Sequence, residues 1–170
     1  MIQKYSDLRV LEVFFKEPTE THFIREIGRK INLAPTSVKI IINNLLKQKF
    51  INIKKAKPFN GYVANRENDE FLFFKKTYNL MKLYELNNLI IQEIHPKAIV
   101  LFGSYSKGED IETSDIDILI ISKVKKELNF PDIEKKLKRK INIMIIENLK
   151  KLEPQIIKKI YNGIVVYGEI

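Results

Sequence analysis

The sequence predicts an α+β protein in which a basic helical domain precedes a small α/β domain. Two observations indicate this class: helical periodicity followed by a hairpin pattern up to residue 68, and short apolar strands alternating with helices after residue 96. The 170 residues suffice for one domain or two small ones. The pattern divides the chain into an N-terminal domain (1–68), a linker helix (69–95) and a C-terminal domain (96–170).

The amino-acid composition limits the cellular compartment and the kinds of partner that we expect for this protein. No apolar run approaches the roughly 18 residues of a membrane span, and cysteine is absent, so we expect a cytoplasmic protein without disulfides or membrane contact. Residues 1–68 carry 13 Lys and Arg against 6 Asp and Glu, whereas residues 69–170 carry 17 against 15. This localised positive charge favours a nucleic-acid partner, with a solvated lysine-rich surface as the alternative reading.

The N-terminal domain shows three helical segments. Ser6 precedes the first, Glu17-Pro18 ends it, and residues 22–30 form the second. Pro35 opens the third, which continues through SVKIIINNLLKQ. Short helices followed by a longer one across a tight turn are typical of a helix-turn-helix.

A hairpin pattern follows the third helix. The segments FINIKKAKPF and YVAN flank Asn60-Gly61, a strong hairpin turn signal. Together with the three helices, this segment resembles the winged-helix domains of archaeal and bacterial transcription regulators, which insert the third helix into the major groove of duplex DNA. A winged helix can instead serve dimerisation or protein docking. The resemblance predicts these DNA-contacting residues: Thr36, Ser37, Lys39, Lys54, Lys55 and Lys57.

Residues 69–93 repeat large apolar side chains at helical intervals. A lone helix in water could not bury all of them, so we expect the linker helix to pack on a domain or on a second copy of the chain. The interpretation favours a homodimer, which would suit a two-fold DNA site.

The stretch LFGSYSKGEDIETSDIDILI contains two aspartates within an apolar strand pattern. Asp115 and Asp117 share one face of the predicted strand because side chains alternate, so their charges repel unless a cation lies between them. Mg²⁺ is the simplest such cation, since one or two carboxylates and substrate phosphates commonly hold it. Gly103-Ser104, at the end of the preceding strand, offers backbone N–H groups and a hydroxyl to a triphosphate.

Gly103-Ser104 followed after ten residues by Asp115-Ile116-Asp117 resembles the signature of the polymerase-β-like nucleotidyltransferase superfamily, and in particular its minimal, antitoxin-like branch. The likeness covers roughly residues 96–168, and the whole layout resembles archaeal fusions of a winged helix with such a domain. It implies a small mixed sheet, Mg²⁺, and transfer of a nucleoside monophosphate from ATP or another nucleoside triphosphate to a hydroxyl. In related antitoxins the acceptor is a tyrosine of a helical HEPN-type toxin.

The resemblance also assigns individual residues. Asp115 and Asp117 are the implied catalytic metal ligands, and Gly103, Ser104, Lys107 and Ser114 the nucleotide-binding residues. Lys107 stands where many relatives have arginine, which gives up bidentate contact with phosphate.

One position departs from the superfamily pattern. The third carboxylate corresponds here to Asn142, an amide that can ligate a metal through its carbonyl but is a poor base. Three hypotheses remain open: a nucleotidyltransferase tethered to DNA, a weak or inactive regulator that senses nucleotide or a partner, and an antitoxin-like subunit that acts by contact alone.

Overall fold

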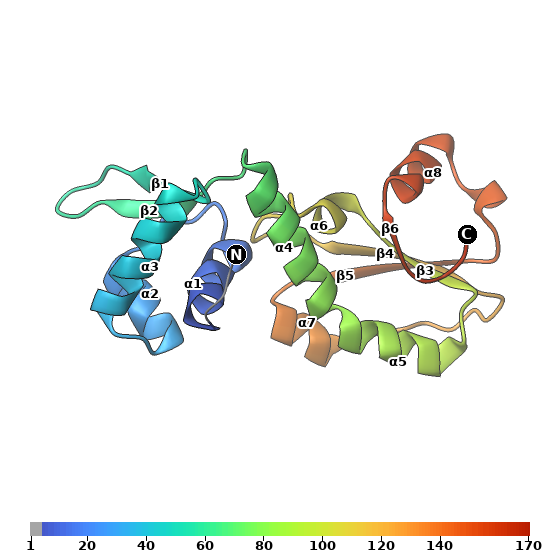
Figure 1. Ribbon diagram of the computed structural model, residues 1–170. Coiled ribbons are helices and arrows are strands. Elements are labelled where there is room, and N and C mark those ends of the chain that lie inside the picture. Colours follow the sequence, from blue (N-terminus) through green and yellow to red (C-terminus); the bar gives the residue numbers. More distant parts are fainter. Residues whose placement is uncertain (1–4) are drawn as a thin grey trace. The chain divides into compact units, whose positions relative to one another are not determined.

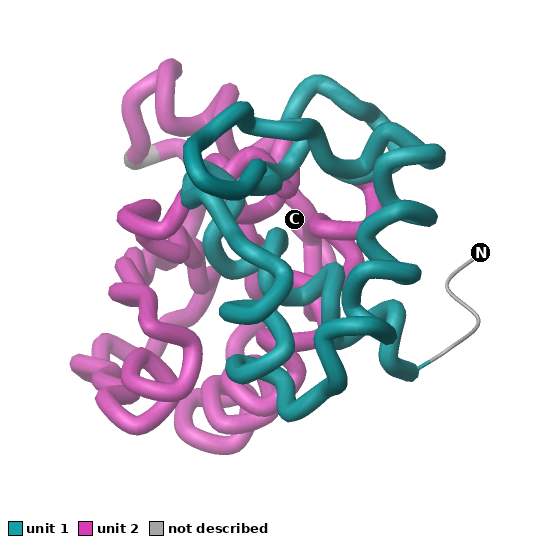
Figure 2. The backbone as a smooth tube through the Cα atoms, turned by 90° about the vertical axis from the view of Figure 1, so that its left-hand side faces the viewer, with its two compact units in different colours: residues 1–72 teal, residues 73–170 magenta. Residues whose placement is uncertain are grey.

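The computed structural model describes residues 5–170 (Figure 1). Residues 1–4 of the predicted N-terminal domain lie outside this range. The chain forms two compact units, unit 1 (residues 1–72) and unit 2 (residues 73–170), which Figure 2 colours separately.

Within residues 5–72, unit 1 contains three complete helices, a two-stranded hairpin and the beginning of a fourth helix. Pro35 begins the third helix, where its missing N–H breaks no helical hydrogen bond. Phe14, Ile27 and Val38, one from each helix, are completely buried in the core. The elements are α1 (Tyr5–Lys16), α2 (Ile24–Ile31), α3 (Pro35–Lys47), β1 (Ile51–Lys54) and β2 (Gly61–Ala64).

The hairpin forms, but its turn differs from the prediction. Lys54 pairs with Gly61, so residues 55–60 make a six-residue loop and Gly61 lies in β2. His22 and Tyr62 exchange two backbone hydrogen bonds of 2.8 Å, which brings the segment before α2 against β2. A Cβ on Gly61 would lie 2.2 Å from the Thr21 side chain, so this glycine is needed for close approach rather than for a tight turn.

The predicted single linker helix is wrong: the structure has α4 (Asp69–Lys82) and α5 (Tyr84–Ile94). Leu83 separates them, and its N–H contacts the carbonyls of Asn79 and Leu80 in a tightened turn. The apolar face of α5 is buried in the core of unit 2, as expected for part of the apolar surface of residues 69–93, whereas Phe73, Met81 and Tyr84 remain exposed. The division between units falls within α4, so this helix contributes residues to both.

Unit 2 is built on a four-stranded sheet of order β5-β4-β3-β6, which is a small mixed sheet of the kind that the resemblance implies. The β4–β5 pair is parallel, and β3 runs antiparallel to both β4 and β6. Its strands are β3 (Ala98–Phe102), β4 (Ile116–Ile121), β5 (Ile141–Ile146) and β6 (Ile164–Gly168). Its remaining helices are α6 (Gly103–Lys107), α7 (Pro131–Leu137), the 3-10 turn η1 (Leu149–Lys151) and α8 (Pro154–Tyr161).

Strand alternation gives the sheet two apolar faces. On one face, β3 and β4 pack with α5 and α7, and Ile90 and Ile118 lie in this core. On the other face, Val100 and Leu119 pack with Ile160 of α8. Asp117 has the same strand parity as Leu119, so its carboxylate lies at the end of the α8 face.

No helix within residues 5–170 combines the length and the apolar character that crossing a membrane requires.

Candidate functional site: a cleft at the ends of β3, β4 and β5

The junction between β3 and α6 lies directly against the acidic strand. The chain turns at Gly103 with φ +75°, a conformation that favours glycine. A Cβ at this position would lie 2.4 Å from Oδ2 of Asp117, so the absent side chain also makes room for the carboxylate. Gly103-Ser104 follows directly after β3, as the sequence predicts, and begins α6.

Asn142 joins the two aspartates. The parallel register places Asn142 beside Asp117, and its Nδ2 donates to Oδ2 of Asp115 and to Oδ1 of Asp117, both at 3.2 Å. An N–H donor shared by two carboxylates offsets part of their mutual repulsion, because it places positive partial charge between them. The predicted juxtaposition of these three side chains is therefore present in the structure.

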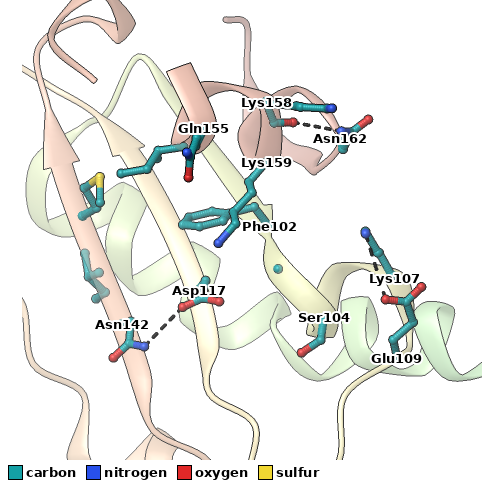
Figure 3. A pocket seen from close by; sticks show the side chains of 14 residues that line it. Phe102, Ser104, Lys107, Glu109, Asp117, Asn142, Gln155, Lys158, Lys159 and Asn162 are labelled. Carbon is teal, nitrogen blue, oxygen red and sulfur yellow. Dashed lines mark hydrogen bonds and ion pairs between the residues drawn. The ribbon is translucent and has the colours of Figure 1, made fainter. Parts of the chain in front are cut away.

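A cleft of about 820 Å³ opens beside this group (Figure 3). Residues predicted for the site account for part of its lining: Gly103, Ser104, Lys107, Asp117 and Asn142. The helix α8 supplies lining residues that the sequence analysis did not select: Gln155, Ile156, Lys158 and Lys159, with Asn162 just beyond its end.

The comparisons with known proteins agree with this geometry. Residues 84–167 match the family described as Nucleotidyltransferase domain. Unit 2 thus contains a nucleotidyltransferase domain.

A Methanocaldococcus jannaschii protein named "Putative protein adenylyltransferase" is 42% identical to this chain over 50 residues, 29% of the chain. The chain spans 58% of that protein's length. The family match covers α5 to β6, so the nucleotidyltransferase domain begins earlier than the predicted boundary at residue 96.

Two predicted residues of the nucleotidyltransferase domain lie beside the cleft rather than in its lining. Asp115 is exposed just before β4 and reaches the group through Asn142. Ser114 closes a turn, in which its Oγ accepts from the N–H of Ile111 at 2.9 Å. Lys107 lines the cleft, and its Nζ lies 4.0 Å from Glu109.

A buried polar network supports the loop after α6. Lys75 and Asp110 are 1% and 2% exposed and form an ion pair, and Lys75 also donates to the Asp110 backbone carbonyl at 2.8 Å. Asn79 donates to Oδ1 of Asp110 and to the carbonyl of Tyr105, at 2.8 and 2.9 Å. Burial, and then the Asp110 charge, raise the pKa of the Tyr105 phenol above its usual range. Through these contacts α4 holds Tyr105 and Asp110, which lie at the two ends of the segment leading away from the cleft.

Asp115 and Asp117, the aspartate dyad, together with Asn142 offer oxygen donors that fit a single hard cation. Two carboxylates and one amide are oxygen donors of the kind Mg²⁺ accepts, with substrate phosphates and water completing its shell. Among residues 5–170, no group of three or more histidine, aspartate or glutamate side chains gathers as a metal cage. Asp115 and Asp117 would hold the ion, and Asn142 would add its carbonyl oxygen only after its amide rotates.

In unit 1 the predicted DNA contacts lie on α3 and on the hairpin. Ser37 is half-buried, and the other five are exposed: Thr36, Lys39, Lys54, Lys55 and Lys57. Lys55 and Lys57 belong to the loop between β1 and β2, and Lys54 ends β1. They lie on the surface, and none of them is buried in the core.

Proposed function

We propose that the nucleotidyltransferase domain transfers a nucleoside monophosphate from a nucleoside triphosphate, with ATP as the expected donor, to a hydroxyl acceptor. The observation that carries the proposal is the Asp115–Asn142–Asp117 group beside Gly103 in an open cleft. Mg²⁺, when bound there, would neutralise the phosphates and polarise the reacting phosphorus. In the reaction the acceptor oxygen bonds to the α-phosphorus, the bond to the β-phosphate breaks, and pyrophosphate leaves.

The residues of this chain bind and orient the donor. Ser104 and the backbone at Gly103 face the cleft and would hydrogen-bond to phosphate oxygens, while the network around Asp110 holds the α6 loop in position. The proton of the acceptor hydroxyl passes to water, since an amide at position 142 is a poor base. We therefore expect transfer to be slow compared with a site that has three carboxylates.

The acceptor is proposed from the family resemblance and from the similarity to a named relative. A tyrosine on a HEPN-type helical partner is the expected substrate, and the name of the M. jannaschii relative, "Putative protein adenylyltransferase", supports a protein acceptor. Incubation of the full chain with α-labelled ATP, Mg²⁺ and such a partner should label the partner. Asp117→Asn should abolish the label, while Glu147→Gln, at an exposed carboxylate after β5, should not. An unlabelled partner with the wild-type protein would refute the proposal.

A second function is favoured by the amide at position 142. Because Asn142 donates to both aspartates, the dyad is already partly neutralised without a metal, which suits a domain that binds nucleotide or a partner without turnover. Such a regulator, or an antitoxin-like subunit acting by contact, should bind ATP or its partner yet release no pyrophosphate. Measurable pyrophosphate release that depends on Asp117 would exclude it.

For unit 1 we propose duplex DNA binding by a winged helix. The net charge of residues 1–68, together with the exposed lysines on α3 and the hairpin, supports this proposal. A gel-shift titration at several salt concentrations tests it, since binding through lysine–phosphate contacts must weaken as salt rises. A homodimer, the expected form on a two-fold site, should appear in sedimentation of the complex.

A further inference from the structure

The helix α8 presents a polar stripe to the nucleotidyltransferase cleft. Gln155, Lys159 and Asn162 are spaced at four and three residues, so they share one face of the helix and its end. Ile160, 1% exposed, packs in the core of the α8 face, and Ile156 packs against the same core. These apolar contacts fix the rotation of α8, and the direction of its polar stripe follows from them.

The cleft has an acidic side and a basic side (Figure 3). Asp117 and Asn142 come from β4 and β5, whereas Lys159 enters from α8 and its ammonium end points into the cleft. Lysine side chains outnumber carboxylates in the lining, where Lys107, Lys158 and Lys159 meet Glu109 and Asp117.

The lysines of the cleft differ in their charge partners. Lys107 has Glu109 at 4.0 Å, but within residues 5–170 no ion pair forms at Lys158 or Lys159. Other exposed lysines of unit 2, Lys126 and Lys136, do pair with glutamates. Lys159 thus places an ammonium group without an ion-pair partner in a concave surface, and such a group is suited to an anion of high charge density.

We propose that Lys159, with Lys158 beside it, binds the polyphosphate tail of the donor and makes the site selective for nucleoside triphosphates over monophosphates. The inference rests on the proposed function and adds to it the residues that recognise the β- and γ-phosphates. The aspartate dyad lies at one side of the cleft and α8 at the other, so the polyphosphate tail lies between the carboxylates and the ammonium of Lys159. The ammonium of Lys159 then forms charge-assisted hydrogen bonds with phosphate oxygens.

The test measures binding to the full chain by calorimetry, in Mg²⁺, with three probes: ATP, AMP and inorganic tripolyphosphate. Lys159→Gln should weaken ATP and tripolyphosphate about tenfold, the effect of one lost charged hydrogen bond, and leave AMP within about twofold. Lys159→Arg should keep most of the ATP affinity because it keeps the charge. Lys135→Gln, at an exposed lysine of α7 that does not line the cleft, is the matched control and should change nothing.

The outcomes separate this inference from the function on which it rests. Equal ATP affinity in wild type and Lys159→Gln, or equal losses for ATP and AMP, overturns the role of α8 even if nucleotide transfer is observed. ATP binding that depends on Lys159 supports that role, even if no acceptor is ever labelled and the transfer function fails. No heat from ATP or tripolyphosphate with the wild-type protein overturns both. Melting temperatures of all variants within about 2 °C of each other show that the domain remains folded.

Discussion

In unit 1 the candidate side chains stand on the exposed surfaces of α3 and the hairpin, whereas in unit 2 they lie where strands end and a glycine permits close approach. The core of unit 1 therefore does not fix the position of Lys55 or Lys57, while strand register fixes Asp117 and Asn142 to within hydrogen-bonding distance. Single substitutions at the site of unit 2 should therefore have large effects on stability or ligand affinity, whereas single substitutions on the surface of unit 1 should have small effects. Substitutions in each unit test this contrast.

The largest effect is expected at the buried pair of unit 2. Lys75→Met leaves Asp110 without its ammonium partner, and breaking such a pair costs about 3–5 kcal/mol. Hydrogen exchange should show the amides of β3 and β4 losing protection, with those of α1 to α3 unchanged. Lys75→Met combined with Asp110→Asn should recover part of the stability, because the buried carboxylate that loses Lys75 is then replaced by a neutral amide. Equal loss of protection in both units would contradict the contrast.

A slightly smaller effect is expected at the turn into α6. Gly103→Ala adds a Cβ 2.4 Å from Oδ2 of Asp117 and strains a residue at φ +75°, so ATP affinity in Mg²⁺ should fall by at least about tenfold. Gly108→Ala is the control, because Gly108 has φ +76° and does not line the cleft. Gly108→Ala should lower the free energy of unfolding by about 1–2 kcal/mol and leave the ATP affinity unchanged. Equal affinities in the two variants would show that the close approach at Gly103 is unimportant.

Asn142→Asp should strengthen metal binding at the site of unit 2. Without metal, three carboxylates repel, so the melting temperature in EDTA should fall by a few degrees, about 1 kcal/mol of stability. Mg²⁺ should restore it, and nucleotide transfer should rise about tenfold because a carboxylate replaces the amide. Asn129→Asp, in the exposed loop before α7, should show neither effect. A variant indifferent to Mg²⁺ would argue against a cation at the dyad.

The smallest single effects are expected in unit 1. Lys55→Gln removes one exposed charge from the hairpin loop, so DNA affinity should weaken about two- to threefold at moderate salt. The slope of log affinity against log salt should become shallower by about one. Lys135→Gln in unit 2 should alter neither quantity. A loss of about 100-fold from Lys55→Gln alone would mean that this side chain is held in place by more than surface charge.

The sequence predicted the acidic group of unit 2 because strand alternation and spacing are local properties. Asp115 and Asp117 share a face by parity, whereas Asn142 was implied by the family resemblance, and the parallel β4–β5 register places it beside Asp117. The α8 lysines could not be selected in the same way. Their proximity to Asp117 depends on how a helix packs across the sheet, and an amphipathic helix with two lysines reads equally well as solvated surface.

Two predictions from local sequence signals, the hairpin turn and the single linker helix, differ from the structure. Asn60-Gly61 favours a two-residue turn, yet the approach of Thr21 and His22 draws Gly61 into β2. Continuous helical periodicity over 69–93 favours one helix, yet the chain breaks at Leu83. In both places the pattern identified the correct kind of element and misjudged where it ended.

The helix α4 has a consequence for dissecting this protein. Phe71 is buried among Phe15 and Phe50 of unit 1, and four residues later Lys75 is buried against Asp110 of unit 2. Cutting the chain between Leu72 and Lys75 would therefore leave each fragment with an incomplete helix and only one of these two anchors. Chimeras that exchange the N-terminal unit should keep the spacing from Phe71 to Asn79 unaltered.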